Sequence, residues 1–206
     1  MSNLLQQLNG ELSAVANVAR CSLVQLNNGR NGAGAGIIIH ENGLILTNAH
    51  VVRHNAIEVT LPDERKLSTK ILAYDPELDL AALSVEAKSL PAIELGDSKK
   101  LQPGHLVLAI GHPWGVTGAV SAGSIINVGL PPEIPQIRYE FIQAGLQLRP
   151  GHSGGPLVDA QGQLVGINTM ITGPKVGLAI PIHVVKDFLR QNLGSTPPRK
   201  EIEFNR

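Results

Sequence analysis

The sequence has little cysteine, few aromatic residues and no excess of either charge. Its single cysteine, Cys21, excludes an internal disulfide bond and a cysteine-based zinc cage. Lys and Arg total 17 and Asp and Glu total 17, so the formal net charge is zero. A balanced chain has no net positive field with which to attract nucleic acid or an anionic membrane. We therefore expect neither of these partners.

The N-terminal residues lack the features of a targeting or membrane segment. Residues 1–12 contain no basic start and no long apolar run. Neither a signal peptide nor a transmembrane helix is therefore expected. A cytoplasmic location is the simplest prediction, and a periplasmic or organellar location would follow if a leader had been removed.

Glycine and proline, in contrast, are plentiful. The 206 residues include 22 glycines and 14 prolines, and 43% of the residues are hydrophobic, which is too apolar for a disordered chain. Short apolar runs alternate with turn residues, and this spacing is typical of an all-β barrel or sandwich. The runs are 23–26, 37–39, 44–46, 57–59, 67–72, 106–110, 116–124, 137–142, 156–158, 164–167 and 176–180.

The pattern predicts two small antiparallel barrels with a short helix at each end. Apolar residues recur every three or four positions from Leu4 to Val18, which predicts an amphipathic helix, and residues 182–193 predict a closing helix. The joint between the barrels falls in residues 90–104. We divide the chain into a helical segment (1–20), a first barrel (21–95), a second barrel with the closing helix (96–193) and a polar tail (194–206).

Residues 151–156 carry the clearest chemical pattern, Gly-His-Ser-Gly-Gly-Pro. A serine hydroxyl becomes a good nucleophile only when a base takes its proton and donors stabilise the resulting oxyanion. Glycines beside Ser153 would let the backbone turn sharply enough to aim amides into one pocket. Taken alone, the same motif is equally consistent with an ordinary glycine-rich turn.

Two further residues complete a candidate triad. His50 ends an apolar run and is the candidate base, although a lone histidine is more often structural or exposed. Asp79 lies in an apolar stretch, where a carboxylate needs a partner such as an imidazole N–H or backbone amides. Asp75, beside a proline, is explained more simply as the start of a turn.

The order of the three residues distinguishes between hydrolase folds. The order His50, Asp79, Ser153 is that of chymotrypsin-type proteases. An α/β-hydrolase requires the order Ser, Asp, His. The only histidine after Ser153 is His183, and too little chain follows it to complete such a fold.

Together these motifs resemble the HtrA (Deg) serine proteases over roughly residues 4–191. The matching segments are 47–52 (TNAHVV), 75–83 (DPELDLAAL), 151–157 (GHSGGPL), 166–169 (GINT) and 177–181 (GLAIP). The resemblance implies a chymotrypsin-like double β-barrel and ATP-independent endopeptidase activity on unfolded polypeptides. It implies an acyl-enzyme and no metal or other cofactor.

The resemblance also implies a role for each site residue. Ser153 would be the nucleophile, His50 the general base and then acid, and Asp79 the residue that orients His50. The amides of Gly151 and Ser153 would form the oxyanion hole. The segment Asn168, Thr169 and Met170 would pair with the substrate as an added strand, and Leu148, Ile167 and Ile171 would line the specificity pocket.

The segment before Ser153 contains no acidic residue that could bind a Lys or Arg side chain before the cut. No Asp or Glu lies between Glu140 and Ser153, so we expect a small or medium aliphatic residue before the cut.

The chain departs from the family pattern in four ways. Residues 144–149 read AGLQLR, where the family usually carries an acidic residue and an asparagine. His152 replaces the usual asparagine and is expected to be exposed. The family normally continues into one or two PDZ domains, whereas this sequence ends at Arg206, so either the protein lacks them or they were removed. Family members are commonly trimers held by N-terminal aromatic contacts, but residues 1–20 contain no aromatic residue, so a homotrimer stays open.

Several other signals have simpler interpretations. His50 and His54 have the i, i+4 spacing of a metal-binding helix but lack its glutamate. Trp114 is expected to pack in a core or at a barrel rim, and Cys21 to be a small buried residue. The main alternative to a protease is a catalytically silent peptide-binding or holdase module on the same fold, in which residues 144–149 never form a working oxyanion hole.

Overall fold

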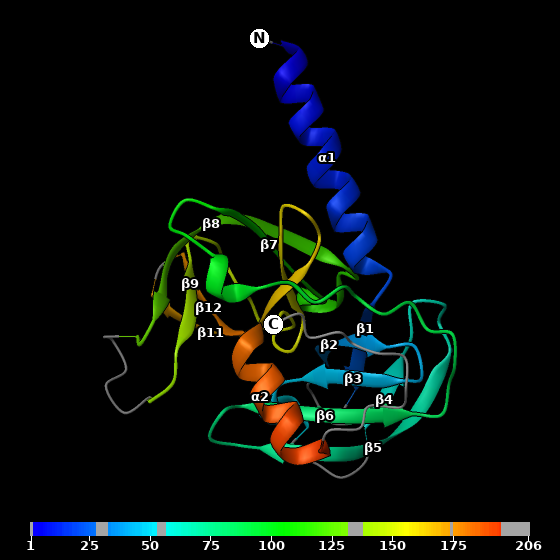
Figure 1. The fold of residues 1–206 in the computed structure, drawn as a ribbon. Coiled ribbons are helices and arrows are strands. Elements are labelled where there is room, and N and C mark those ends of the chain that lie inside the picture. Colours follow the sequence, from blue (N-terminus) through cyan, green and yellow to red (C-terminus); the bar gives the residue numbers. More distant parts are fainter. Residues whose placement is uncertain (1, 28–32, 53–56, 132–137, 174, 195–206) are drawn as a thin grey trace.

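The computed structural model describes residues 2–27, 33–52, 57–131, 138–173 and 175–194. Within these residues, two closed antiparallel barrels of six strands each lie side by side (Figure 1). The predicted double barrel is therefore confirmed. The polar tail predicted for 194–206 lies outside the described residues, apart from Gly194.

The first barrel has the strand order β1-β2-β3-β6-β5-β4, and the second has the order β10-β11-β12-β9-β8-β7. The strands of the first barrel are β1 (Leu23–Asn27), β2 (Ala33–His40), β3 (Leu44–Thr47), β4 (Glu58–Thr60), β5 (Lys66–Asp75) and β6 (Leu80–Val85). Those of the second are β7 (Leu106–Gly111), β8 (Ala119–Gly129), β9 (Phe141–Ala144), β10 (Pro156–Asp159), β11 (Leu164–Gly173) and β12 (Val176–Pro181).

The two predicted helices are present as α1 (Ser2–Arg20) and α2 (Ile182–Leu193). Short 3-10 turns, η1 (Ala49–Val52), η2 (Ser98–Lys100) and η3 (Pro113–Gly115), connect strands. The C-terminal end of α1 lies against the barrels, and its N-terminal end extends away from them (Figure 1). Leu12 and Val15 pack on the buried core, whereas Leu4 and Leu5 are exposed.

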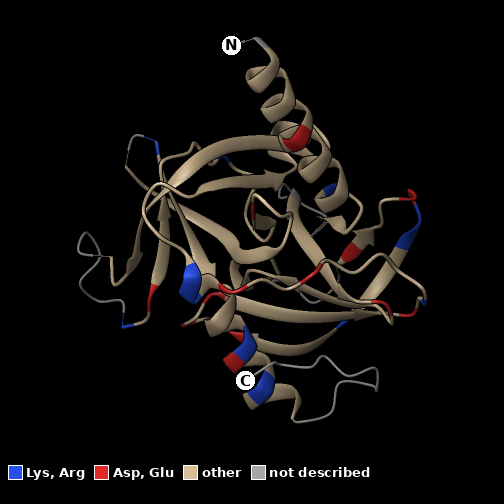
Figure 2. Cartoon of the chain, turned by 45° about the horizontal axis from the view of Figure 1, so that its top comes forward, with Lys and Arg blue, Asp and Glu red and all other residues tan. Residues whose placement is uncertain are grey.

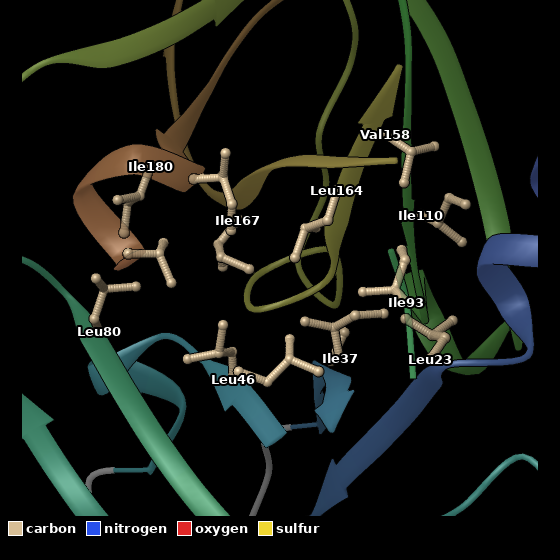
Figure 3. Packing of buried hydrophobic residues seen from close by; sticks show 14 of the residues in the cluster. Leu23, Ile37, Leu46, Leu80, Ile93, Ile110, Val158, Leu164, Ile167 and Ile180 are labelled. Carbon is tan, nitrogen blue, oxygen red and sulfur yellow. The ribbon is translucent and has the colours of Figure 1, made fainter. Parts of the chain in front are cut away.

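The largest buried cluster joins the two barrels rather than filling one of them (Figure 3). Its members come from both barrels and include Leu23, Ile37, Leu46, Leu80, Ile110, Val158, Leu164 and Ile167. Two smaller clusters fill the barrel interiors. Since the interface between the barrels is itself a packed core, residues at their junction have a rigid support.

Burial on both faces explains the continuous apolar runs. In β2, Ile37 and Ile39 face the other barrel, while Ile38 points into the interior of the first barrel. In β7, Ile110 lies at the interface between the barrels and Ala109 fills the second barrel. Successive side chains of a strand point to opposite faces, so a strand buried on both sides reads as an unbroken apolar run.

Charged residues of both signs are distributed over the molecule (Figure 2), in keeping with the zero net charge. No helix in the described ranges is long and apolar enough to cross a membrane. Cys21 was expected to be buried but is exposed, and its thiol donates to the carbonyl oxygen of Asn17 (3.4 Å). It follows the last turn of α1, where the chain turns into β1.

Candidate active site

The three predicted catalytic residues come from three separate segments. His50 lies on η1, directly after β3; Asp79 lies in the turn between β5 and β6; and Ser153 precedes β10. The first barrel therefore supplies the imidazole and the carboxylate, and the second supplies the hydroxyl.

Asp79 holds His50 through both its ring and its backbone. Nδ1 of His50 lies 2.9 Å from Oδ1 and 2.8 Å from Oδ2 of Asp79, and the amide of His50 donates to Oδ1 (3.0 Å). Nδ1 carries the proton in this arrangement because a carboxylate only accepts. The other ring nitrogen, Nε2, is then unprotonated in the neutral ring and able to take a proton.

The carboxylate has a further donor from the second barrel. The hydroxyl of Thr169 donates to Oδ2 of Asp79 (2.7 Å). Burial acts to raise the pKa of Asp79, but the hydrogen bonds from His50 and Thr169 outweigh it, and the pKa lies below its ordinary value. Asp79 is therefore ionised at neutral pH and accepts hydrogen bonds from both barrels.

The backbone at Asp79 is held in an uncommon conformation. Its φ is +55°, in the left-handed region. The side-chain amide of Asn48 donates to the Asp79 carbonyl oxygen (3.0 Å), and the hydroxyl of Tyr139 donates to that of Glu77 (2.9 Å). Burial raises the pKa of Tyr139 to about 12, so this hydroxyl keeps its proton.

Oδ1 of Asp75 accepts from the amides of Glu77 and Leu78, which confirms that Asp75 starts the turn.

The hydroxyl of Ser153 donates to the carbonyl oxygen of Thr169 (3.1 Å). Within the described residues it forms no hydrogen bond to His50. Hydrogen bonds between nucleophile and base are often long in proteins without substrate and tighten when substrate binds. Thr169 links Asp79 to Ser153, since its hydroxyl donates to the Asp79 carboxylate and its carbonyl oxygen accepts from the Ser153 hydroxyl.

A tight turn precedes Ser153. The amide of His152 donates to the Arg149 carbonyl (2.9 Å), and Gly151 has φ +103°. Pro150 followed by a glycine with positive φ is the signature of a type II turn. In the described part of the chain the amides of Gly151 and Ser153 donate no hydrogen bond. These are the two amides predicted to form the oxyanion hole.

The nucleophile loop is packed tightly against the first barrel. The amide of Ala35 in β2 donates to the carbonyl oxygen of Ser153 (2.9 Å), and the hydroxyl of Thr47 donates to the carbonyl oxygen of Ala35 (2.8 Å). A Cβ added at Gly154 would lie 2.1 Å from the Ala35 carbonyl oxygen and 2.2 Å from Thr47 Oγ1. No larger residue than glycine fits here, because the two barrels meet at this point.

The predicted substrate-pairing segment divides into two parts. The backbone N and O of Asn168 are bonded to Gly155 and Gly154 (2.9 Å each), and its side-chain amide donates to the carbonyl of Pro156 (2.8 Å). Asn168 therefore holds the nucleophile loop and is not available to pair with a substrate, contrary to our expectation. Beyond it, Thr169 and Met170 belong to the part of β11 that pairs with β12 but no longer with β10.

The predicted pocket residues also separate. Ile171 is exposed and Leu148 is buried against the second barrel, but Ile167 has no exposed surface and packs in the core between the barrels (Figure 3). We therefore reassign Ile167 to the core. Gly177 packs against the same region: a Cβ there would lie 2.8 Å from Leu146 and 2.9 Å from Leu148, so the two leucines lie against its backbone.

Two buried histidines, His112 and His152, lie beside the oxyanion turn, and the burial of neither was predicted from the sequence. His152, expected to be exposed, is 3% exposed, and so is His112. The amide of His112 donates to the carbonyl of Gly151 (2.8 Å) and its Nδ1 accepts from the amide of Gly118 (3.4 Å). Nε2 of each ring has no hydrogen-bond partner within the described residues. His152 is buried because the turn folds its ring back against Arg149.

These histidines predict how stability depends on pH. Burial lowers the pKa of His112 and of His152 below the ordinary value. Between the lowered values and about 6.5, the unfolded chain thus binds more protons than the folded one, so the free energy of unfolding should fall as the pH drops through this window. Urea denaturation between pH 5 and 8 measures the decline. His152→Asn should make it shallower, and equal pH slopes in the two proteins would contradict the account.

A second serine–histidine–carboxylate set differs from the first in access. His183 Nδ1 lies 2.8 Å from Ser98 Oγ, and its Nε2 lies 3.2 Å from Glu140 Oε2. Ser98 is fully buried, so no substrate reaches its hydroxyl. This set connects α2 to η2 and to Glu140, the residue before β9. His54, the partner of His50 in the metal alternative, lies outside the described residues, and within them no three His, Cys, Asp or Glu side chains are grouped as metal ligands.

A double barrel with serine, histidine and aspartate at its junction defines the class of trypsin-like peptidases. The sequence model of the trypsin-like peptidase domain matches residues 34–167, from β2 to β11. That range contains all three residues of the candidate triad and covers more than half of the chain.

Individual relatives narrow the class. The chain is 41% identical over 162 residues to the serine protease HhoB of Synechocystis, and 44% identical over 165 residues to a DegP-like periplasmic serine endoprotease of Pseudomonas putida. These matches cover 76% and 77% of the chain. The structure of the HtrA-type protease AlgW with a decapeptide superimposes with a TM-score of 0.80, at 30% identity over 88% of this chain and 67% of that one. The chain therefore belongs to the HtrA family of trypsin-like serine proteases.

The matched relatives are longer than this chain. It spans 39% of the length of HhoB and 34% of the P. putida protein. The chain also spans only part of the AlgW structure solved with a tripeptide, namely 63% of that chain, with a TM-score of 0.80 and 35% identity.

Proposed function

We propose that the chain is a serine endopeptidase that cleaves unfolded polypeptides through an acyl-enzyme, without a metal or organic cofactor. One observation carries this proposal: His50, Asp79, Thr169 and Ser153 form a continuous hydrogen-bonded set, and the two nearby amides of Gly151 and Ser153 donate no hydrogen bond among the described residues. Each component of acyl transfer is thus represented, namely nucleophile, base, orienting carboxylate and oxyanion donors.

The proposed reaction follows from these positions. Oγ of Ser153 attacks the substrate carbonyl carbon while Nε2 of His50 takes its proton, and Asp79 stabilises the imidazolium. The amides of Gly151 and Ser153 donate to the oxyanion that develops. His50 then gives the proton to the leaving amine, and the C–N bond breaks. In the second half of the reaction water attacks the acyl group while His50 takes a proton from it, and His50 returns that proton to Oγ of Ser153 as the acyl group leaves.

Substrate selection is proposed to combine backbone pairing with a small pocket. The part of β11 from Thr169 to Ile171 pairs with β12 on one side, and an extended peptide added at its other edge would bind through main-chain hydrogen bonds. Such pairing needs an unfolded substrate because a folded chain has its backbone groups engaged. The closely packed Leu146 and Leu148 beside Gly177 favour Val, Ala or Leu before the cut.

Truncating the pocket should change this preference. Leu148→Ala removes one of the two side chains that a Cβ at Gly177 would contact, so larger residues such as Phe should be accepted before the cut. We expect a shift of about tenfold in the ratio of kcat/KM for Phe over Val, since a single methylene group in a hydrophobic pocket discriminates by about 10- to 200-fold. Cleavage-site profiling of an unfolded protein measures this ratio. Cuts chiefly after Lys or Arg in the wild type would overturn the assigned pocket.

Hydrolysis of an unfolded protein tests the function itself. The wild type should degrade a reduced, unfolded substrate and spare its folded form, and Ser153→Ala should degrade neither. The alternative is a peptide-binding module without catalysis, which is favoured by the turning of the Ser153 hydroxyl toward Thr169. On that alternative, wild type and Ser153→Ala would bind unfolded protein equally and neither would cut it.

The cellular compartment also enters the proposal. Several curated relatives are described as periplasmic. We propose the periplasmic alternative for this chain in place of the cytoplasm, and fractionation of cells that express it naturally would decide between them. We make no proposal for or against a homotrimer, which the sequence left open. Measurement of the mass of the protein in solution decides the question.

A further inference from the structure

An exposed aromatic residue and an arginine meet beside the oxyanion turn. Trp114 was expected to be packed but is 70% exposed. The guanidinium carbon of Arg149 lies 4.4 Å from the centre of its ring, within the range of a cation–π interaction. Nη2 of Arg149 also donates to Oε1 of Gln147 (3.0 Å). The guanidinium therefore has a defined position.

The backbone at this place is strained. Trp114 has φ +53°, which is rare for a bulky residue, and it is followed by Gly115 with φ +80°. Strain of this kind persists only where surrounding contacts hold it, and it gathers at functional sites. Here the contact is with the oxyanion turn, because a Cβ added at Gly151 would lie 2.4 Å from the carbonyl oxygen of His112 and 2.8 Å from Pro113 Cα.

The strand order places this pair on the far side of the nucleophile from β11. The loop carrying Ser153 leads into β10, whose two neighbours in the barrel are β11 and β7. On one side the loop is bonded to Asn168 of β11, and on the other Gly151 accepts from His112, which follows β7. A peptide whose residues before the cut pair with β11 therefore passes Ser153 and reaches Trp114 and Arg149 with its residues after the cut.

Arg149 has no carboxylate partner within the part of the chain that the structure describes. None of the ion pairs among the described residues includes it. An arginine whose fork is held by stacking on an aromatic face is suited to bind a carboxylate.

We propose that Trp114 and Arg149 form a subsite for an acidic side chain, Asp or Glu, in the first two residues after the cut. The inference rests on the proposed function, because that function sets the direction of the peptide. Trp114 holds the guanidinium in place, and Arg149 selects the charge. The pocket near Gly177 reads the residue before the cut, so the two preferences are independent.

Trp114 is the only tryptophan in the chain, which allows a test that does not need hydrolysis. Three peptides with Val before the cut, differing only in Glu, Gln or Lys at the second residue after it, are titrated into the Ser153→Ala protein. The change in tryptophan fluorescence measures the binding of each peptide. The Glu peptide should bind about two- to fivefold more tightly than the Lys peptide, with a smaller difference at high salt, as for a partly exposed ion pair.

Replacing the arginine separates charge selection from a structural effect on the turn. In the Ser153→Ala background, Arg149→Gln should give equal affinities for the three peptides, and Arg149→Lys should keep part of the preference. Equal affinities of the Glu and Lys peptides without the Arg149 change would overturn the proposal. So would an equal loss for all three peptides in Arg149→Gln, or peptide binding, detected calorimetrically, without any change in fluorescence.

A failure of the subsite is distinguishable from a failure of the proposed function. If wild-type protein cuts all three peptides at equal rates, the protease assignment stands and the acidic subsite is wrong. If the Glu peptide binds best but no peptide is cut, the subsite stands and the protease assignment is wrong.

Discussion

Asp79→Asn is expected to lower kcat by about 10⁴-fold at neutral pH, with little change in KM. An asparagine at this position can present its amide group to Nδ1 of His50, which would stabilise the tautomer that carries the proton on Nε2. The base would then have no lone pair facing the nucleophile, and the imidazolium would lose its neighbouring negative charge. Steady-state hydrolysis of a peptide with Val before the cut measures the effect.

Asp75→Asn is the matched control for this exchange. Asp75 lies in the same turn, and its Oδ1 accepts from the amides of Glu77 and Leu78. An asparagine side-chain oxygen can accept the same bonds, so activity should stay within about twofold, in line with the small effects of substitutions that keep such contacts. A similar loss in both variants would show that the turn, and not the charge on His50, is what matters.

Gly154→Ala is expected to lower kcat/KM by at least about 100-fold, because displacement of a reacting group by about 1 Å has this cost. The added Cβ would meet the carbonyl oxygen of Ala35 and the hydroxyl of Thr47, and φ at Gly154 is +81°. The loop must move away from the first barrel, and Ser153 moves with it. The crowding should also destabilise the fold by about 1–3 kcal/mol, measurable by urea denaturation.

A second glycine shows whether the effect is specific. Gly10 lies within α1, and a Cβ there would meet nothing within 4 Å. Gly10→Ala should keep full activity and should stabilise the helix by up to about 1 kcal/mol. Wild-type activity in Gly154→Ala would mean that the nucleophile loop is not fixed by the contact between the barrels.

Patterns within the sequence were sufficient to predict the fold. The runs at 37–39 and 44–46 predicted strands, and α2 occupies residues 182–193 as expected. The candidate triad could be assembled because the glycines around Ser153, the apolar stretch around Asp79 and the order of the residues constrain one another. The structure brings His50 and Asp79 into hydrogen-bond contact.

Contacts between distant segments could not be predicted in the same way. The burial of His152 depends on a turn that folds its ring against Arg149, and the exposure of Trp114 depends on a backbone conformation that tryptophan rarely adopts. Asn168 and Ile167 stand next to each other in a motif that suggested substrate contacts, yet both are used to hold the barrels and the loop together. Only the three-dimensional arrangement distinguishes these roles.

Covalent labelling with a fluorophosphonate probe tests the central claim most directly, since the probe reacts with an activated serine. Intact-mass and peptide analysis of the folded protein, at neutral pH and with a substrate peptide present, should find one adduct on Ser153. Ser153→Ala should abolish labelling and His50→Ala should strongly reduce it. Absence of an adduct on the folded wild type under these conditions would contradict the account, because Ser153 would then lack an activating base.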